Sequence, residues 1–380
     1  MKRFLTLIAI LQAMLAAAVF RRLDTTASGR RIQRRSDSVA DRMSVLVPVL
    51  NEAGRLEPCL AGLASQGDEV VEILVIDGGS CDGTRALVRS WETRDPRVRL
   101  IDAAPVPNGV NGKAHGLRIG LEHAAASSEW VLTIDADVRP DPLLVRSLLA
   151  HARSEDISAL SAATLQRLSG PAEALLHPAM LTSLVYRFGI PGHATDNIDR
   201  VQANGQCFLT RRDLLDAVGG FESVLDSVCE DVTLARSIAA RGVPVGFYET
   251  DELVAVEMYS SWHDAWENWM RSLPMRDRFS GPAQYIGLAE VLLVQALPIW
   301  LAPLSRLVGG TRNPAMVINL ALVAARFGVL AGTARAYERR PWTYWLSPLS
   351  DLPVALRLIV MFRRRRHSWR GRSFISGGLA

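Results

Sequence analysis

The stretch that decides the fold is Trp130-Val131-Leu132-Thr133-Ile134-Asp135-Ala136-Asp137. Its first five residues form a short apolar run, which predicts a buried strand. Because side chains alternate along a strand, Asp135 and Asp137 should point the same way at its end, and Ala136 away. Two carboxylates on one face provide hard oxygen ligands suited to Mg²⁺ or Mn²⁺ on a diphosphate. A lone Asp-x-Asp is more often a solvated loop pair, so its meaning depends on what accompanies it.

Three further acidic stretches accompany this pair. Two lie upstream, Val45-Leu46-Val47-Pro48-Val49-Leu50-Asn51-Glu52 and Ile73-Leu74-Val75-Ile76-Asp77-Gly78-Gly79-Ser80-Cys81-Asp82-Gly83-Thr84, and one lies downstream, Cys229-Glu230-Asp231. Glu230 and Asp231 open a predicted helix, where acidic residues are also stabilised by the helix dipole, so a capping role is an alternative for them. The other acidic residues follow predicted strands, and this recurrence favours a functional site.

Strand and helix patterns alternate between residue 43 and about residue 165. The predicted strands are Met43–Leu50, Val71–Ile76, Val98–Ile101, Trp130–Ile134 and Ile157–Ala163, and the predicted helices are Arg55–Ser65, Thr84–Glu92, Lys113–Ala126 and Pro142–Ala152. This alternation predicts an α/β fold with a mostly parallel sheet and helices on both faces. Ligands of such sheets bind at the carboxyl ends of the strands, where the acidic residues fall.

Lysine is almost absent from this chain. Of 43 lysine and arginine residues, only Lys2 and Lys113 are lysine. Arginine is therefore the default cation, and Lys113, within Asn111-Gly112-Lys113-Ala114, is interpreted as a compact ammonium required at its position. The alternative is a solvated loop lysine.

Both ends of the chain are apolar. Phe4–Phe20 is followed by several arginines, which favours an uncleaved anchor over a cleaved signal peptide. Three late stretches, Tyr285–Val308, Ala315–Ala331 and Trp342–Phe362, approach the ~20 residues that cross a bilayer. The alternative is buried core helices, and prolines in the third stretch favour a re-entrant or interfacial segment there.

A basic tail and a tryptophan stripe flank these late stretches. The arginine-rich tail suits anionic lipid headgroups, and no nucleic-acid-binding motif is present. Trp262, Trp266 and Trp269 share one face of a predicted helix, followed by Arg271. Such a stripe is usually core, but its place before an apolar stretch favours a helix at the membrane interface.

The four cysteines form no C-x-x-C pair. Neither a zinc site nor a disulfide framework is therefore indicated, and a reduced, cytoplasmic setting is expected for the catalytic part.

Taken together, the motifs resemble family 2 inverting glycosyltransferases over about residues 43–280. They are Val47-Pro48-Val49-Leu50-Asn51-Glu52, Asp77-Gly78-Gly79-Ser80, Gly112-Lys113-Ala114, Asp135-Ala136-Asp137, Gly219-Gly220-Phe221 and Glu230-Asp231. The resemblance implies a GT-A fold, a nucleotide-diphosphate-sugar donor and a divalent cation, Mg²⁺ or Mn²⁺. The apolar ends resemble the membrane subgroup that glycosylates carotenoids, hopanoids or ceramides. Asn268-Trp269-Met270-Arg271-Ser272 departs from the Gln-x-x-Arg-Trp of processive relatives, which makes a polysaccharide synthase less favoured.

The resemblance also implies roles for individual residues. On the donor side, Pro48 and Glu52 contact the nucleotide, Asp77 the uracil or ribose, and Lys113 the diphosphate. Asp135 contacts the ribose or the metal, and Asp137 is the direct metal ligand. Asp231 is the general base, supported by Glu230. The acceptor and the membrane interface are assigned to Trp262, Trp266, Trp269 and Arg271.

The expected organisation follows from these assignments. It is an anchor at 1–22, a GT-A catalytic domain at 43–258, an amphipathic region at 259–280, C-terminal membrane helices at 285–362 and a basic tail at 363–380. The expected protein is a multi-pass inner-membrane enzyme with a cytoplasmic catalytic domain. It transfers a hexose from a UDP-sugar, UDP-glucose foremost, to a lipid such as a carotenoid or hopanoid.

Three alternatives stay open at this point: a cell-envelope polysaccharide glycosyltransferase of the same family, a nucleotidyltransferase and an inactive membrane scaffold. A nucleotidyltransferase usually has a glycine-rich basic loop where this chain has Asn51-Glu52-Ala53-Gly54-Arg55. A scaffold is expected to lose acidic residues, and none is missing. The sequence leaves open the acceptor, the sugar, the choice of Mg²⁺ or Mn²⁺, the number of membrane crossings and the oligomeric state.

Overall fold

The computed structural model describes residues 1–250, 252–310, 313–364, 366–369 and 372–375. Its contacts divide the chain into two compact units. The α/β unit comprises residues 29–166, 191–258 and 365–380, and the helical unit comprises residues 1–28, 167–190 and 259–364. Each unit is described by itself below.

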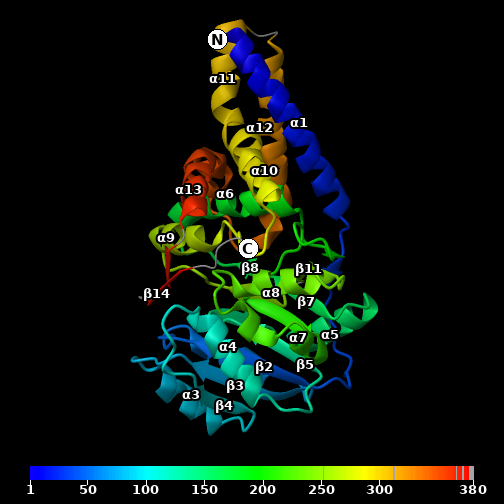
Figure 1. The fold of residues 1–380 in the computed structure, drawn as a ribbon, viewed down its shortest axis with the longest axis vertical. Coiled ribbons are helices and arrows are strands. Elements are labelled where there is room, and N and C mark those ends of the chain that lie inside the picture. The colour runs from blue at the N-terminus through cyan, green and yellow to red at the C-terminus, as the bar shows by residue number, and fades with distance from the viewer. Residues whose placement is uncertain (251, 311–312, 365, 370–371, 376–380) are drawn as a thin grey trace. The chain divides into compact units, whose positions relative to one another are not determined.

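A nine-stranded sheet forms the centre of the α/β unit (Figure 1). Its strands are β1 (Arg31–Ile32), β2 (Met43–Val49), β3 (Val70–Asp77), β4 (Val98–Asp102), β5 (Trp130–Ile134), β7 (Ala159–Ala163), β9 (His193–Thr195), β10 (Cys207–Arg211) and β11 (Val245–Thr250). The order is β1-β11-β7-β10-β5-β2-β3-β4, with β9 paired to β11. Only β9 and β10 pair antiparallel to their neighbours, so the sheet is mostly parallel, as predicted.

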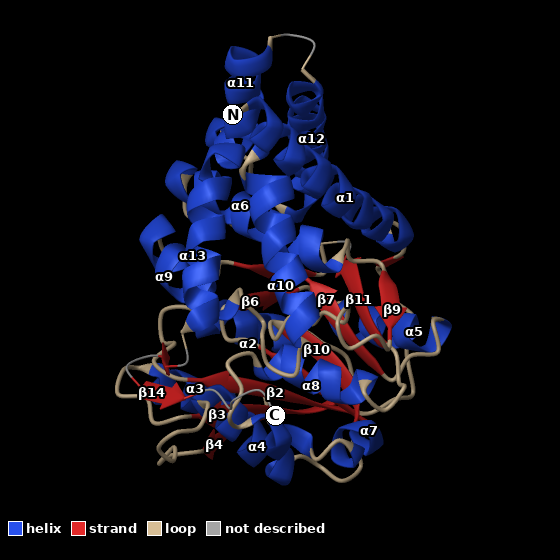
Figure 2. Ribbon diagram, turned by 45° about the horizontal axis from the view of Figure 1, so that its top comes forward, coloured by secondary structure: helices blue, strands red, loops and turns tan. Residues whose placement is uncertain are grey.

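Helices cover both faces of this sheet (Figure 2). On one face Val45 and Val47 of β2 join a core with α2 (Leu56–Ala64), α3 (Thr84–Glu92) and α5 (Leu144–Ser154). On the other face Leu46 joins a core with α4 (Gly112–His123), α7 (Arg212–Ala217) and α8 (Glu230–Ala239). Adjacent residues of β2 are thus buried on opposite faces, which explains why Val45–Val49 is continuously apolar.

The remaining elements of the α/β unit are small. A second sheet has the order β6-β12-β8, and a further pair is β13-β14. Their bounds, with a short 3-10 helix η1, are β6 (Val138–Pro140), β8 (Leu165–Gln166), η1 (Gly220–Val224), β12 (Val254–Val256), β13 (Arg366–Trp369) and β14 (Arg372–Ile375).

The helical unit contains long apolar helices, together with one π-helical turn and short 3-10 helices. Its elements are α1 (Lys2–Thr26), α6 (Pro171–Phe188), α9 (Trp262–Ser272), α10 (Gly281–Glu290), the π-helical turn η2 (Val291–Ala296), α11 (Pro298–Gly309), α12 (Pro314–Gly332), η3 (Thr333–Ala336), η4 (Trp342–Ser350) and α13 (Asp351–Arg363). In the described part of the chain, three helices are long and apolar enough to cross a membrane, namely Lys2–Thr26, Pro314–Ala336 and Trp342–Arg363. A fourth candidate is the pair Gly281–Ala296 and Pro298–Gly309, which is bent by 59°.

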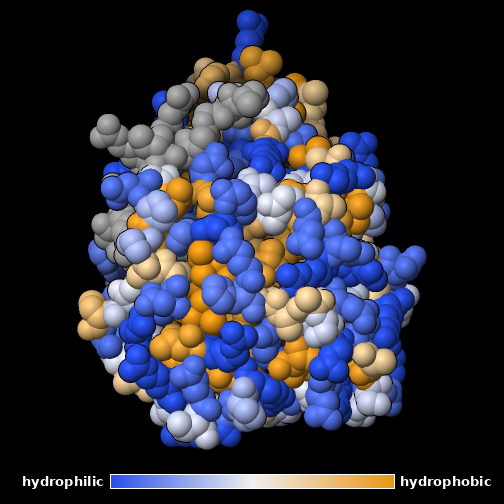
Figure 3. All heavy atoms as spheres, turned by 60° about the horizontal axis from the view of Figure 1, so that its bottom comes forward, coloured by the Kyte–Doolittle hydropathy of each residue, from blue (hydrophilic) through white to orange (hydrophobic). Residues whose placement is uncertain are grey.

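Exposed apolar side chains distinguish the two units. The face drawn in Figure 3 is mainly hydrophilic, with hydrophobic patches between the polar side chains. In the part of the chain that the structure describes, Ile198 is the only strongly exposed large hydrophobic residue of the α/β unit. The helical unit exposes many, including Phe4, Leu7, Leu307 and Val360. This distribution fits a helical unit that faces lipid.

The two compact units differ from the expected ranges at two places. The segment with α6 lies inside the expected catalytic range 43–258 but packs in the helical unit. Residues 29–42, which lie outside the expected domain ranges, include β1, which adds a parallel strand to β11. Within the expected basic tail, residues 365, 370–371 and 376–380 lie outside the described residues.

Candidate active site

The site of the α/β unit is built at the carboxyl ends of β2, β3 and β5. These strands are neighbours and parallel, so the segments that follow them meet at one edge of the sheet. Val49 of β2 pairs with Asp77 of β3, and β5 ends at Ile134, immediately before Asp135. The acidic residues that the sequence places after strands are therefore brought together, with Glu230 and Asp231 added from the first turn of α8.

Hydrogen bonds join the loop after β2 to the loop after β3. The Asn51 backbone N–H donates to Ser80 Oγ (2.9 Å), and Asn51 Oδ1 accepts from the Cys81 N–H (2.9 Å). The Glu52 N–H donates to Thr84 Oγ1 (2.8 Å). Asn51 has a positive φ of 57°, which asparagine tolerates better than most residues. These bonds fix the loop that presents Glu52.

Lys113 links two carboxylates of the site. Its Nζ lies 2.6 Å from Asp135 Oδ1 and 2.9 Å from Glu230 Oε1. Burial disfavours the ammonium charge, but the carboxylates of Asp135, Glu230 and Asp231 outweigh this effect and hold the pKa of Lys113 well above its ordinary value. Lys113 is thus a charged group inside the site, and the alternative of a solvated loop lysine is wrong.

Asp231 is held by the backbone. Its Oδ2 accepts from the Gly205 N–H (2.5 Å), and its Oδ1 accepts from the Val232 N–H (2.8 Å). Burial, with the nearby Glu230 carboxylate, raises the pKa of Asp231 to about 7, against the opposing effect of Lys113. A carboxyl group whose pKa lies near neutrality is well matched to proton transfer at cellular pH.

Asp137 lies beside Arg55. Its Oδ2 is 3.9 Å from Arg55 Nη1, while Arg55 also pairs with Glu52 at 3.1 Å. Burial, together with the neighbouring Asp135, raises the pKa of Asp137 to about 7. Among the described residues, Asp137 Oδ1 is buried with no hydrogen-bond partner. A buried carboxylate oxygen of this kind fits a cation ligand, because a bound cation satisfies it and offsets the repulsion from Asp135.

The described residues do not supply a complete metal cage. Within the described residues, no group of three or more His, Cys, Asp and Glu side chains is arranged to hold a metal ion. Mg²⁺ commonly takes only one or two carboxylates and fills its other positions with water and substrate phosphates. The Asp135 and Asp137 pair fits that mode of binding.

Asp77 is completely buried and already has partners. It accepts from the Ser80 N–H (3.0 Å) and pairs with Arg85 Nη1 at 2.7 Å. A carboxylate has about four acceptor positions, so the predicted bond to uracil or ribose has to be shared with these groups. Arg85, which the sequence argument did not single out, is therefore a neighbour of the predicted donor-binding residue Asp77.

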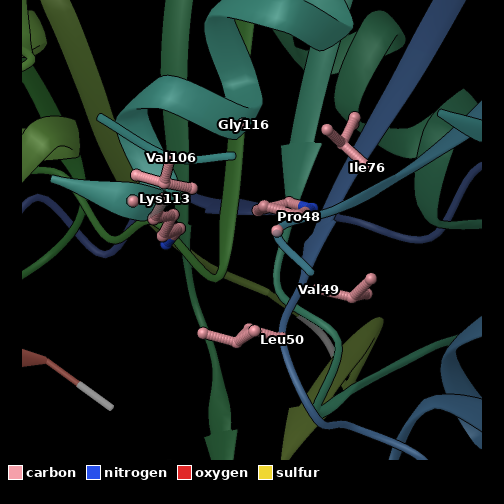
Figure 4. A pocket seen from close by; sticks show the side chains of 9 residues that line it. Pro48, Val49, Leu50, Ile76, Val106, Lys113 and Gly116 are labelled. Atoms are coloured by element: carbon pink, nitrogen blue, oxygen red, sulfur yellow. The ribbon is translucent and has the colours of Figure 1, made fainter. Parts of the chain in front are cut away.

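An apolar pocket opens between the ends of β2 and β3 and the first turns of α4. Figure 4 shows Pro48, Leu50, Ile76, Val106 and Lys113 among its lining side chains. Gly112 and Gly116 of α4 also line it, and their lack of a side chain widens the space beside Pro48. The pocket combines flat apolar walls with one cation, a combination suited to a base linked to phosphate.

The tryptophans predicted at the acceptor side belong to the helical unit. Trp262 is 50% exposed, and Trp266 lies 5.5 Å from the guanidinium of Arg357. Trp269 lies between two rings, with centroid distances of 4.4 Å to His177 and 6.4 Å to Tyr259. The three therefore differ, since Trp262 is a surface residue and Trp269 is part of an aromatic cluster.

Three contributing residues were not identified from the sequence. Arg55 contacts two acidic residues of the site, and Gly205 approaches Lys113 so closely that an added Cβ would lie 2.8 Å from Nζ. Asn111 bonds Glu230 through its side chain. Arg55 and Asn111 adjoin quoted motifs, but the contacts that bring Arg55 to Asp137, Asn111 to Glu230 and Gly205 to Lys113 join positions far apart in sequence.

Comparison with known proteins gives the family. A family model for glycosyl transferase family 2 matches residues 44–219. The chain contains a family 2 glycosyltransferase domain. That domain covers β2 to β10 and includes the carboxyl ends of β2, β3 and β5.

Relatives of this glycosyltransferase domain are distant. The succinoglycan biosynthesis protein ExoA of Rhizobium meliloti (strain 1021) is 27% identical over 228 residues, covering 58% of this chain and 64% of that protein. The GalNAc(5)-diNAcBac-PP-undecaprenol beta-1,3-glucosyltransferase of Campylobacter jejuni is 30% identical over 96 residues, covering 25% of this chain and 29% of that protein. Both matches span less than two thirds of the relative's length.

One solved structure shares the fold over nearly the whole chain. The mannosyltransferase PcManGT from Pyrobaculum calidifontis, in complex with GDP-Man and Mn²⁺, aligns with a TM-score of 0.55 and 22% identity. The alignment covers 93% of this chain and 99% of that one. The predicted GT-A-like fold with terminal apolar helices, the family resemblance and the glycosyltransferase class are confirmed. The roles assigned to single residues stay predictions.

Proposed function

We propose that the chain is a membrane-bound inverting glycosyltransferase that moves a hexose from a nucleotide-diphosphate sugar to a lipid acceptor. The observation that carries the proposal is Lys113, whose ammonium contacts both Asp135 and Glu230. One charge thereby connects the carboxylate pair on the donor side with the acidic pair at the start of α8. The leaving group and the attacking group of a transfer reaction would meet at this point.

The donor is held by the α/β unit. The pocket with Pro48, Ile76 and Val106 receives the nucleobase, and Asp77 with Arg85 borders the ribose. Glu52 lies next to this nucleotide, paired with Arg55. Lys113 contacts the diphosphate and neutralises the charge that develops as the sugar departs. UDP-glucose is the proposed donor, and GDP-mannose, which PcManGT binds, is the alternative to be tested.

Asp137 and Asp135 would hold a divalent cation, Mg²⁺ or Mn²⁺. The cation supplies further neutralisation of the leaving diphosphate. The unpartnered Asp137 Oδ1 supports this assignment, and the Mn²⁺ in the PcManGT complex is consistent with it.

Asp231 acts as the general base. As the acceptor oxygen attacks the anomeric carbon, its proton passes to Asp231, and the bond from that carbon to the diphosphate oxygen breaks on the opposite side. The configuration at the carbon is therefore inverted. The Gly205 N–H orients the carboxylate, and Glu230 supports it through Lys113.

The acceptor is proposed to be a lipid such as a carotenoid or hopanoid. The apolar helices of the helical unit support a multi-pass membrane location, and the arginines after α1 favour a cytoplasmic catalytic domain. The Campylobacter relative is named for an undecaprenol-linked substrate, which is also consistent with a lipid acceptor. Trp262, Trp266, Trp269 and Arg271 of α9 remain the proposed contacts with the acceptor and the interface.

A second candidate is a glycosyltransferase of cell-envelope polysaccharide assembly. The observation that favours it is the similarity to ExoA, which is named for succinoglycan biosynthesis. In that case the acceptor would be a lipid-linked oligosaccharide.

The test measures UDP release from UDP-glucose by membranes containing the chain, with and without added lipid extract, and identifies the products by mass spectrometry. GDP-mannose is run in parallel, and Asp231→Asn is the inactive control. Lipid-stimulated UDP release with a hexosylated lipid product supports the proposal. A hexosylated oligosaccharide-lipid favours the second candidate, and no nucleotide release from either donor overturns both.

A further inference from the structure

Asn111 makes two kinds of contact at the edge of the site. Its side chain is almost completely buried, at 5% exposure. Its Oδ1 accepts from the N–H groups of Lys113 (2.9 Å) and Ala114 (3.3 Å), which caps the first turn of α4. Its Nδ2 donates to the carbonyl oxygen of Ser227 (2.9 Å) and to Glu230 Oε2 (3.3 Å).

The second kind of contact reaches the segment that leads into α8. The Asn111 backbone N–H also donates to the Leu225 carbonyl oxygen at 2.7 Å. Residues 225–229 connect η1 with α8, whose first two residues are Glu230 and Asp231. One residue therefore ties the start of the helix with Lys113 to the segment that ends at the proposed base.

We propose that Asn111 is a positioning residue for this base, which rests on the function proposed above for Asp231. Its amide NH₂ fixes the distance between the first turn of α4, with Lys113, and the first turn of α8, with Asp231. The Gly205 N–H and this anchor hold Asp231 from two directions. A small displacement of a catalytic group costs much of the rate, because the reacting atoms lose their alignment.

The two contacts can be separated chemically. A carboxamide both accepts and donates, whereas an ionised carboxylate only accepts. Asn111→Asp therefore keeps the cap of α4 and loses the bonds to Ser227 and Glu230. Asn111→Ser also keeps a capping oxygen, adds no charge and is too short to replace the amide NH₂. Asn111→Ala loses both contacts.

The chain offers a matched control at Asn313, the residue that caps α12. Its Oδ1 accepts from the Ala315 N–H, and its Nδ2 donates to the Ser305 carbonyl oxygen. Asn313→Asp makes the same chemical change in the helical unit, where none of the acidic residues of the site belongs. It should leave turnover unchanged.

The experiment compares these variants by melting temperature, UDP binding, turnover with UDP-glucose and lipid extract, and hydrogen exchange of residues 225–231. For Asn111→Asp and Asn111→Ser we expect wild-type melting and UDP binding, faster exchange in 225–231, and turnover lower by about 10²-fold. Asn111→Ala should show the same loss of turnover with lower melting.

Three results would overturn the proposal. Wild-type turnover and exchange in Asn111→Ser would make Asn111 only a helix cap. An equal loss of UDP binding and turnover would indicate a general defect of the site. If turnover falls in Asn111→Asp but not in Asn111→Ser, the added negative charge and not the lost amide NH₂ causes the fall. Hydrogen exchange needs no substrate, so it tests the anchor even if the proposed reaction is wrong.

Discussion

The two units differ in the side chains that they expose. The helical unit exposes apolar residues and buries two ion pairs, Arg22 with Glu290 and Arg326 with Asp351, each at 2.8 Å. The α/β unit buries its apolar residues in two cores and leaves pairs such as Arg211 with Asp213 on the surface.

The difference teaches how to interpret a buried charge in each unit. In a unit that faces lipid, charges have to pair inside, so a buried pair indicates how helices assemble. In a unit that faces water, a charge gains nothing from burial, so buried charges indicate chemistry. We therefore expect the pair of Lys113 and Glu230 to serve function and the pair of Arg326 and Asp351 to serve assembly. The predictions below test this distinction.

The largest effect is expected at Asp231. Asp231→Asn keeps the shape and loses the basicity, so turnover should fall by ~10²–10⁴-fold while UDP binding and melting stay near wild type. Glu230→Gln should be milder. The measurement is turnover with a hydroxylated lipid and UDP-glucose. Full activity of Asp231→Asn would assign the base to another residue, and activity restricted to a carboxylated lipid would indicate an acidic acceptor.

The buried pair of the helical unit should dominate stability instead. Arg326→Met alone leaves the Asp351 carboxylate buried without its guanidinium partner, which costs about 3–5 kcal/mol of unfolding free energy. Combining it with Asp351→Leu should recover most of that loss. The measurement is the fraction of folded protein in detergent as temperature rises.

The matched comparison is the exposed pair of the α/β unit, where Arg211→Met should cost less than about 1 kcal/mol. An equal cost at the two sites would show that Arg326 and Asp351 are not in an apolar environment. UDP binding by the folded fraction of both variants should be unchanged.

Cation dependence tests the carboxylate pair. Asp137→Ala should lower turnover by about 10²-fold or more, the scale of losing a main electrostatic stabiliser. EDTA should abolish transfer, and Mn²⁺ or Mg²⁺ should restore it. The readout is turnover at increasing cation concentration, with Asp213→Ala as an exposed control. Full activity in chelator would refute the cation assignment.

The raised pKa values predict how stability depends on pH without a cation. Asp137 and Asp231 rise from 3.8 to about 7. Between these values the folded chain binds more protons than the unfolded chain, so the free energy of unfolding should fall as pH rises through this range. The loss should be on the order of a few kcal/mol, since one pKa unit corresponds to about 1.4 kcal/mol.

Melting in EDTA at about pH 5 and about pH 7.5 measures this slope. Asp137→Asn with Asp231→Asn should remove it, and Mn²⁺ should stabilise the wild type at the higher pH. If melting of the double variant still depends on pH in this way, groups other than Asp137 and Asp231 cause the dependence.

The sequence predicted the sheet and the acidic residues because both are local patterns. Continuous apolar runs such as Ile73–Ile76 indicate a strand buried on both faces, and the carboxylates follow directly at the strand ends. Parallel pairing then brings Asp77 and Asp135 to one edge without further information.

Partners distant in sequence could not be predicted in this way. Asn111 reaches Glu230 across 119 positions, and α6 packs in the helical unit although it lies within the range expected for the catalytic domain. Such contacts depend on how the packed helices and strands meet, and the hydrophobic periodicity of a single segment carries no information about this.

The smallest effect is expected from the tryptophans of α9, and it differs along the helix. Trp262 is half exposed. Trp262→Ser should therefore lower transfer to lipid by a few-fold, which is about the contribution of one apolar side chain at a membrane interface. UDP binding and melting should stay unchanged. Trp269 packs against His177 with tilted rings, so Trp269→Ser should lower melting as well as transfer. The measurement is transfer to lipid in vesicles and to the same lipid in detergent. If Trp262 meets the bilayer, its variant is impaired in vesicles and nearly normal in detergent. An equal loss in both settings, accompanied by lower melting, would place Trp262 in the core of the helical unit and remove α9 from the membrane interface.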